Sequence, residues 1–264
     1  MRRAAHQLLD EPRVFDDPLA VAIANGESEE PSDAQQPLSR ALRAFLVVRS
    51  RYAEDQLARA VDRGVRQYVV LGAGLDTFAY RNPFQSAGLR VFEVDHPATQ
   101  AWKRAQLRDA GIAIPDEMTF AAVDFERQSL DEGLSAAGFS KQQPAFFSWL
   151  GVTPYLSRAA FDATIAFIAR MPPGSGVVFD YAVERSLLSP SQQVALDALA
   201  ARVARAGEPF QLFFDPSVLA SDLASRGFQN IEDLNGEAIN ARYFGGRTDG
   251  LAVGGGGRLL SCFI

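Results

Sequence analysis

The protein has 264 residues, of which 47% are hydrophobic and 22% are charged, and its formal net charge at pH 7 is −6. These values are typical of an ordinary globular protein with one large α/β domain, since 264 residues are hardly enough for two. The negative charge, with no long Lys- and Arg-rich block, argues against nucleic-acid binding, while one cysteine and two histidines exclude an intramolecular disulfide and disfavour a metal site.

The N-terminal residues do not have the pattern of a secretory signal. Asp10 and Glu11 follow the two arginines at positions 2 and 3 before any apolar run begins. Nowhere in the sequence are there 18 apolar residues in a row, as a membrane-spanning helix needs. We therefore expect a cytoplasmic protein that does not bind membranes.

The first 48 residues combine helical patterns with a polar loop. Pro12 and Pro18 interrupt the helical pattern of residues 4–25, and residues 26–37 are polar with two prolines. We expect residues 1–48 to form a helical cap or lid, and residues 49–264 to form the main domain. The alternative is a helical extension without a functional role.

Residues 38–63 have the pattern of a helix that Gly64 ends. Arg49 and Arg51 lie near its middle. Residues two apart on a helix point in different directions, so we expect at most one of these arginines to face a common site. The sequence does not decide which one.

The stretch Tyr68–Thr77 changes abruptly from an apolar run to Gly72, Ala73 and Gly74, with Asp76 two residues later. Such a run predicts a strand buried on both faces, and its glycines would let the backbone approach a ligand at the carboxyl end of the strand. A sharp turn without a ligand is the alternative. Thr77 stands where a phosphate-binding loop would have a third glycine, and the Asp76 carboxylate would repel phosphates. The pattern therefore favours an adenosine ligand with a cationic end, such as S-adenosylmethionine.

Two further strands are predicted to end in an acidic residue. Residues 91–95 end at Asp95, which could accept both hydrogen bonds of a ribose diol, and residues 118–124 end at Asp124, which could accept from the adenine amine while Phe125 packs on the ring. Either carboxylate could instead cap the helix that follows it.

The rest of the chain continues the alternation of strand and helix. Residues 144–151 and 176–181 are predicted strands, and helices are expected over 157–171, 190–206 and 216–226. Residues 210–214 could be strand or irregular, and residues 228–234 and 259–264 are expected as strands. We predict a doubly wound, Rossmann-like α/β sheet of seven strands whose last hairpin is antiparallel, with the N-terminal helical cap.

Several motifs in this order resemble the class I S-adenosylmethionine-dependent methyltransferases, specifically the leucine carboxyl methyltransferase-like family. The matching segments cover nearly the whole chain: Phe15–Ala20, Arg49–Tyr52, Leu71–Thr77 with Tyr80 and Arg81, Phe92–Pro97, Val123–Phe125 and Gly151–Leu156.

This resemblance implies that Arg49 or Arg51 holds the carboxylate of the cofactor methionine, for which the guanidinium fork is well suited. It also implies that the glycine loop lies under the methionine portion of the cofactor. The full set of expected cofactor-binding residues is Arg49, Arg51, Gly72, Ala73, Gly74, Asp76, Asp95, His96, Asp124, Phe125 and Leu150. Two positions depart from the family: many members have arginine at Phe78 and glutamate at Leu150, so cofactor affinity or acceptor choice can differ here.

The reaction implied is methyl transfer to a hydroxyl or carboxylate of a small molecule. A carboxylate acceptor needs no base, whereas a phenol or alcohol does, and we take Tyr155 and Tyr181 as the catalytic candidates, with Asp180 and His96 as further choices. A binding protein that keeps the fold without catalysis, and a nicotinamide-dependent oxidoreductase, are the alternatives. The sequence leaves the oligomeric state open, including a homodimer.

Overall fold

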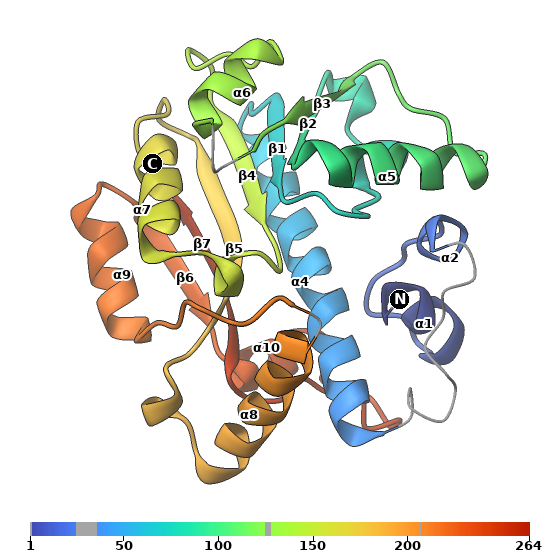
Figure 1. Ribbon diagram of the computed structural model, residues 1–264, viewed down its shortest axis with the longest axis vertical. Helices are drawn as coiled ribbons and strands as arrows, with labels where there is room; N and C mark the ends of the chain where they lie inside the picture. The colour runs from blue at the N-terminus through green and yellow to red at the C-terminus, as the bar shows by residue number, and fades with distance from the viewer. Residues whose placement is uncertain (1, 25–35, 125–127, 206) are drawn as a thin grey trace.

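The computed structural model describes residues 2–24, 36–124, 128–205 and 207–264. Within them, seven strands form one sheet in the order β3-β2-β1-β4-β5-β7-β6 (Figure 1). The strands are β1 (Gln67–Leu71), β2 (Arg90–Asp95), β3 (Met118–Ala122), β4 (Ala145–Trp149), β5 (Gly176–Ala182), β6 (Gln229–Leu234) and β7 (Gly257–Phe263).

The sheet is mixed in the predicted way. Strands β1 to β5 pair in parallel, whereas β7 runs antiparallel between β5 and β6. Every residue of β1, β4 and β5 is buried, as expected of central strands with helices on both faces. The seven-stranded sheet with an antiparallel last hairpin is therefore confirmed.

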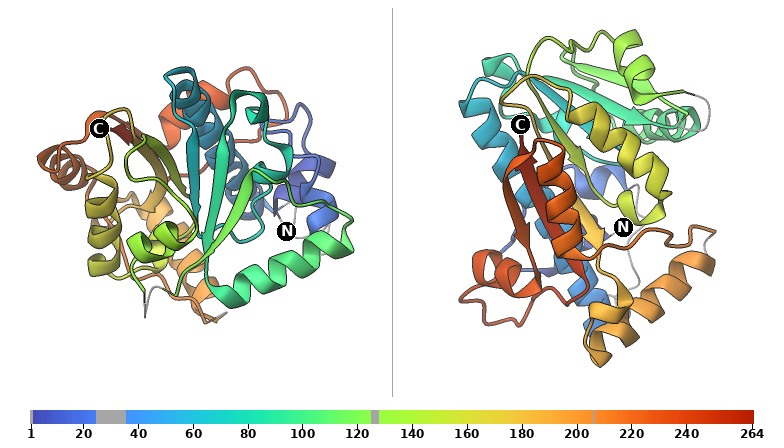
Figure 2. Two further views of the ribbon diagram at one scale, coloured as in Figure 1. Left: turned by 90° about the horizontal axis from the view of Figure 1, so that it is seen from above. Right: turned by 90° about the vertical axis from the view of Figure 1, so that its left-hand side faces the viewer.

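Helices cover both faces of the sheet (Figure 2). One face carries α6 (Leu130–Ala136), α7 (Arg158–Ile168) and α9 (Pro216–Ser225), whose apolar side chains join one core cluster with the sheet. The other carries α4 (Pro37–Asp62), α5 (Pro97–Asp109) and α10 (Gly236–Tyr243). Short 3-10 turns η1 (Phe78–Arg81) and η2 (Gln85–Ala87) connect β1 to β2. None of the helices in the described ranges is long and apolar enough to span a bilayer.

The N-terminal segment is packed into the main domain. It consists of α1 (Arg2–Leu9), which lies beside α4, and α2 (Ala20–Ile23), which lies beside α1 (Figure 1). The Asp10 carboxylate is buried and accepts hydrogen bonds from Arg43 Nε at 2.7 Å and Arg43 Nη2 at 2.9 Å, while its Oδ2 lies 2.8 Å from His6 Nδ1. The boundary expected at 48/49 falls inside α4, which is one continuous helix of 26 residues.

The C-terminal third contains α8 (Pro190–Arg205), one difference from the sequence-based expectation, and one segment for which the sequence left two alternatives. Residues 236–243 form α10, capped by the Asn235 side chain, where no helix was predicted. Residues 210–214 are irregular and contribute only the isolated bridge of Phe214 to Val183. Both segments connect the outer strands, where the strict alternation of strand and helix has ended.

Candidate functional site

The glycine loop follows β1 at the carboxyl edge of the sheet. Gly72 and Gly74 have φ angles of +67° and +42°, in the left-handed region that favours glycine. A Cβ atom at Gly72 would lie 2.4 Å from Val152 Cγ2, whereas one at Gly74 would meet no protein atom within 4 Å. The Gly72 and Ala73 amides both donate to the Val94 carbonyl, which fixes the loop against β2. Gly72 is thus required by packing, and Gly74 presents open space.

Asp95, at the end of β2, is bound to this loop. Its Oδ2 accepts from the Gly74 amide at 2.6 Å, and its Oδ1 accepts from the His96 amide at 2.8 Å. Each carboxylate oxygen has two lone pairs, so both oxygens keep one for a ligand such as a ribose diol. The helix cap is a different residue, because the Ala98 amide donates to His96 Nδ1. The exposed His96 is therefore the N-cap of α5, and the capping alternative for Asp95 is wrong.

Asp124 follows β3 at the same edge and is half-buried. The helix after it is capped by Ser129, whose hydroxyl accepts from the Glu132 amide in a capping box. The capping alternative for Asp124 is therefore also wrong. Phe125 lies outside the residues that the structure describes.

The Asp76 carboxylate is bound by groups of the protein itself. Its Oδ1 accepts from the Phe78 amide at 2.9 Å, and its Oδ2 lies 3.4 Å from Nη1 of Arg3 in α1. Burial alone would raise the pKa of Asp76, but the charges of Arg3 and Lys103 and the Phe78 hydrogen bond lower it below its ordinary value. The cation that Asp76 attracts in this structure therefore comes from the N-terminal segment of the protein itself.

Arg49 and Arg51 point to different places, as their spacing in the helix requires. The Arg49 side chain is 21% exposed, and its Nη1 lies 3.1 Å from Oδ2 of Asp180. The Arg51 side chain is 49% exposed and pairs on the surface with Asp55 at 2.8 Å. Only Arg49 is thus brought to the carboxyl edge of β4 and β5.

Asp180 and Gly151 hold Arg49 in place. Asp180, on β5, is 4% exposed, and its Oδ1 accepts from the Gly151 amide at 2.5 Å. The Arg49 guanidinium lies across Gly151, where a Cβ atom would come within 2.6 Å of Nη2. Leu150 is half-buried beside this group and packs on the α4 side of the core. One carboxylate therefore joins α4, β5 and the loop after β4.

The two tyrosines predicted as catalytic lie in different surroundings. Tyr155 ends the 3-10 turn η3 (Thr153–Tyr155) after β4, is half-buried, and contacts the Phe210 ring at a centroid distance of 5.3 Å. Burial and the charge of Glu208 raise the pKa of the Tyr155 phenol. Tyr181 is 2% exposed and donates a 2.7 Å hydrogen bond to Asp233 on β6. Tyr181 is on the opposite face of β5 from Asp180, so the structure does not bring it to the site.

Asp180 was considered in the sequence only as a possible base, and its role beside Arg49 was missed. The signal that could have found it was available, since Asp180 is an acidic residue near the carboxyl end of a predicted strand, as Asp95 is. Nothing in the sequence, however, indicates that this carboxylate faces α4.

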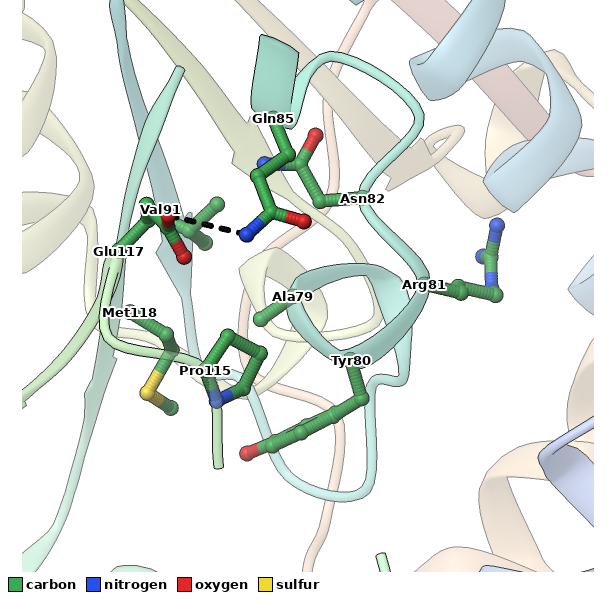
Figure 3. Close-up of a pocket in the computed structure, with 9 residues that line it drawn as sticks. All are labelled: Ala79, Tyr80, Arg81, Asn82, Gln85, Val91, Pro115, Glu117 and Met118. Atoms are coloured by element: carbon green, nitrogen blue, oxygen red, sulfur yellow. Dashed lines mark hydrogen bonds between the residues drawn. The ribbon is translucent and has the colours of Figure 1, made fainter. Parts of the chain in front are cut away.

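A cavity of about 180 Å³ lies elsewhere, at the amino ends of β2 and β3 (Figure 3). Its walls come from η1, η2 and the starts of both strands, and Gln85 donates to Glu117 across it at 2.9 Å. Another hollow, of about 420 Å³, lies near the amino end of β5 and the last turns of α4. Neither is at the edge where the glycine loop and Asp95 lie.

The sequence comparisons give the family of the chain. Residues 1–169 match the family model described as leucine carboxyl methyltransferase. The chain belongs to this family. A relative from Bacillus subtilis, "Putative S-adenosyl-L-methionine-dependent methyltransferase YktD", is 33% identical in an alignment 277 residues long that covers 95% of this chain and 91% of that protein.

Solved structures share the fold of this methyltransferase. A "putative methyltransferase" from Thermobifida fusca has a TM-score of 0.59 at 18% identity, covering 92% of this chain and 91% of that one. The magnesium protoporphyrin IX methyltransferase of Synechocystis, solved with S-adenosylhomocysteine, has a TM-score of 0.52 at 13% identity, covering 91% of this chain and 90% of that one. At these identities the likeness concerns the fold alone.

The residues at the carboxyl edge fit S-adenosylmethionine. Gly74 leaves a space that a side chain would fill, Asp95 keeps acceptor capacity beside it, and Arg49 presents a guanidinium next to Gly151. A nucleoside with an amino-acid end needs these three kinds of contact.

Proposed function

We propose that the protein is an O-methyltransferase that transfers the methyl group of S-adenosylmethionine to a hydroxyl or carboxylate of a small molecule. The family gives the reaction class: the chain is an S-adenosylmethionine-dependent methyltransferase. Oxygen as the acceptor atom, and a small molecule as the acceptor, are the parts that we add.

The observation that best supports the cofactor site on which the proposal rests is the position of Arg49. Arg49 comes from α4, outside the strand-and-loop pattern, yet its guanidinium lies over Gly151 at the same sheet edge as Gly74 and Asp95. In our proposal it holds the cofactor carboxylate, because a guanidinium fork matches a carboxylate in two parallel hydrogen bonds. Arg51 has no such role, since it pairs with Asp55 at the surface.

The other cofactor contacts follow the strand order. We assign the ribose to Asp95, the adenine to Asp124, and the methionine portion to the loop of Gly72, Ala73 and Gly74. Asp76 supports that loop from behind, through the Phe78 amide and Arg3. We also assign to this site Leu150, the half-buried apolar residue directly after β4.

Bound S-adenosylmethionine supplies a methyl group that its sulfonium already activates. The protein then has to bind the acceptor in line with that group and exclude water. We assign contact with the acceptor to Tyr155, because it lies just beyond β4, where the charges of Arg49 and Asp180 act on its phenol. Its raised pKa keeps the phenol protonated at neutral pH, so it would donate a hydrogen bond to the acceptor instead of removing a proton. A carboxylate acceptor needs no base, whereas a hydroxyl acceptor would transfer its proton to Asp180 or His96, the remaining candidate bases.

Two measurements test the proposal. Titration calorimetry should give saturable heat with S-adenosylmethionine and with S-adenosylhomocysteine, and incubation with pooled phenols, alcohols and carboxylic acids should yield one O-methylated product by mass spectrometry. Binding without turnover of any acceptor would favour a binding protein that keeps the fold. Methylation of amines alone would overturn O-methylation but leave the cofactor site intact.

A further inference from the structure

The N-terminal segment is fastened to the chain directly behind the glycine loop. Residues 75–81 lead from that loop through η1, and four of them make hydrogen bonds or ion pairs with side chains from residues 2–24: Leu75, Asp76, Thr77 and Arg81. Residues 2–24 and 75–81 together contain two motifs that stand out in the sequence, Phe15–Ala20 and Tyr80–Arg81. The cofactor assignments give neither motif a role.

Asp17 is the centre of this attachment. It has no solvent exposure, and its Oδ1 accepts from the Thr77 hydroxyl at 2.8 Å. The same oxygen lies 3.5 Å from Nε of Arg81, and Oδ2 lies 3.8 Å from Nε of Arg3. A buried carboxylate is tolerated only with such partners, so Asp17 fixes all of them relative to one another.

Arg3 makes the second attachment. Its Nη2 donates to the Leu75 carbonyl, and its Nη1 lies 3.4 Å from the Asp76 carboxylate. Leu75 and Asp76 directly follow Gly74, whose amide is bound to Asp95. A shift of this part of the chain would therefore move the Gly74 amide away from Asp95.

Arg81 completes the connection on the side of the main domain. Its guanidinium donates two hydrogen bonds to the Glu54 carboxylate of α4, one of 2.9 Å from Nη1 and one from Nη2, and it lies over the Phe15 ring at 5.0 Å. Arg81 is thus shared between α4 and the N-terminal segment. The chain behind the glycine loop is held from both sides.

We propose that Asp17 and Arg3 are positioning residues for cofactor binding: they hold residues 75–77 so that Gly74 and Asp95 keep the geometry that receives the nucleoside. This inference rests on the proposed function, because it takes the glycine loop as the cofactor site. Neither residue needs to touch the cofactor for this role. The N-terminal segment is then part of the cofactor site as its support.

The chain supplies a matched control for the test. Asp16 precedes Asp17, but its side chain is 72% exposed and pairs only at the surface with Arg13 at 3.3 Å. We would measure the Kd of S-adenosylhomocysteine by calorimetry for the wild type, Asp17→Asn and Asp16→Asn, together with the thermal midpoint and the acceptor KM. Asp17→Asn should raise the Kd about tenfold with little change in acceptor KM, and Asp16→Asn should match the wild type.

A second pair of variants covers the case in which Asp17→Asn does not fold. Arg3→Ala removes a side chain that is 17% exposed, and should raise the Kd severalfold, while Arg3→Lys should recover part of the loss and Arg13→Ala should have no effect. An unchanged Kd in folded Asp17→Asn or Arg3→Ala, with only a lower thermal midpoint, would overturn the inference. A wild type that does not bind S-adenosylhomocysteine would instead overturn the proposed function.

Discussion

The two halves of the carboxyl edge are built in different ways. Around β1 and β2 the site is made mainly of backbone: Gly72 and Gly74 shape the loop, and Asp95 binds main-chain amides. Around β4 and β5 it is made of side chains from distant segments, with Arg49 and Asp180 separated by 131 residues. The first half depends on conformations that only glycine adopts easily, and the second on one ion pair. The two halves should therefore respond differently to mutation.

The largest effect is expected in the backbone half. Gly74→Val should weaken S-adenosylhomocysteine binding by about 100-fold or more, because the new side chain would occupy the open space beside Asp95. The measurement is titration calorimetry.

Gly64→Val is the control for backbone strain. Gly64 also has a positive φ, +97°, and also meets no atom within 4 Å, but it ends α4 away from the site. If the Kd of S-adenosylhomocysteine for Gly74→Val were within threefold of the Kd for Gly64→Val, the glycine loop would not be the cofactor site.

The next effect separates the two arginines in the side-chain half. Arg49→Met should raise the Kd of S-adenosylhomocysteine about 30-fold, since a charge-assisted hydrogen bond contributes about 2 kcal/mol. Arg51→Met should stay within about twofold, because surface ion pairs contribute little. Equal effects of the two substitutions, by the same titration, would contradict the assignment of the carboxylate to Arg49.

A smaller effect distinguishes the tyrosines. Tyr155→Phe should raise the acceptor KM about fivefold and leave the cofactor Kd unchanged, because it removes one neutral hydrogen bond of about 1 kcal/mol. Tyr181→Phe should leave KM unchanged and lower the thermal midpoint, because Asp233 loses a buried donor. Steady-state kinetics and thermal melts measure these effects. A raised acceptor KM in Tyr181→Phe but not in Tyr155→Phe would mean that Tyr181 and not Tyr155 contacts the acceptor.

The smallest effect concerns pH and the N-terminal support of the backbone half. Burial alone would raise the pKa of Asp10, but hydrogen bonds from His6 and Arg43 lower it far below its ordinary value of 3.8. Because the native state holds this carboxylate ionised, the stabilisation is present above pH 4 and is lost as the pH falls toward the native pKa.

Thermal melts between pH 3 and 7 would measure this. The thermal midpoint of the wild type should fall toward pH 3. Asp10→Asn should have a lower midpoint at pH 7, and its midpoint should change less with pH. Asp16→Asn, which changes an exposed carboxylate of the same segment, should follow the wild-type curve. If the thermal midpoint of Asp10→Asn fell with pH as steeply as that of the wild type, other carboxylates would cause the loss of stability in acid.

The sequence by itself determined where the strands lie in the chain, that the first five are parallel, and the backbone half of the candidate site. Apolar runs such as Tyr68–Leu71, and the glycines that follow, report local conformation, which depends on neighbours in the chain. Asp95 and Asp124 could be placed because parallel strands end at one edge of the sheet.

Only the tertiary structure showed that Arg49 and not Arg51 faces the carboxyl edge, that Asp180 pairs with Arg49, and that Tyr181 lies in the core. It also showed that Asp76 binds Arg3. Each of these depends on which face a side chain presents and on what a distant segment brings to it. Local pattern does not encode such pairings, because they form only when the helices pack on the finished sheet.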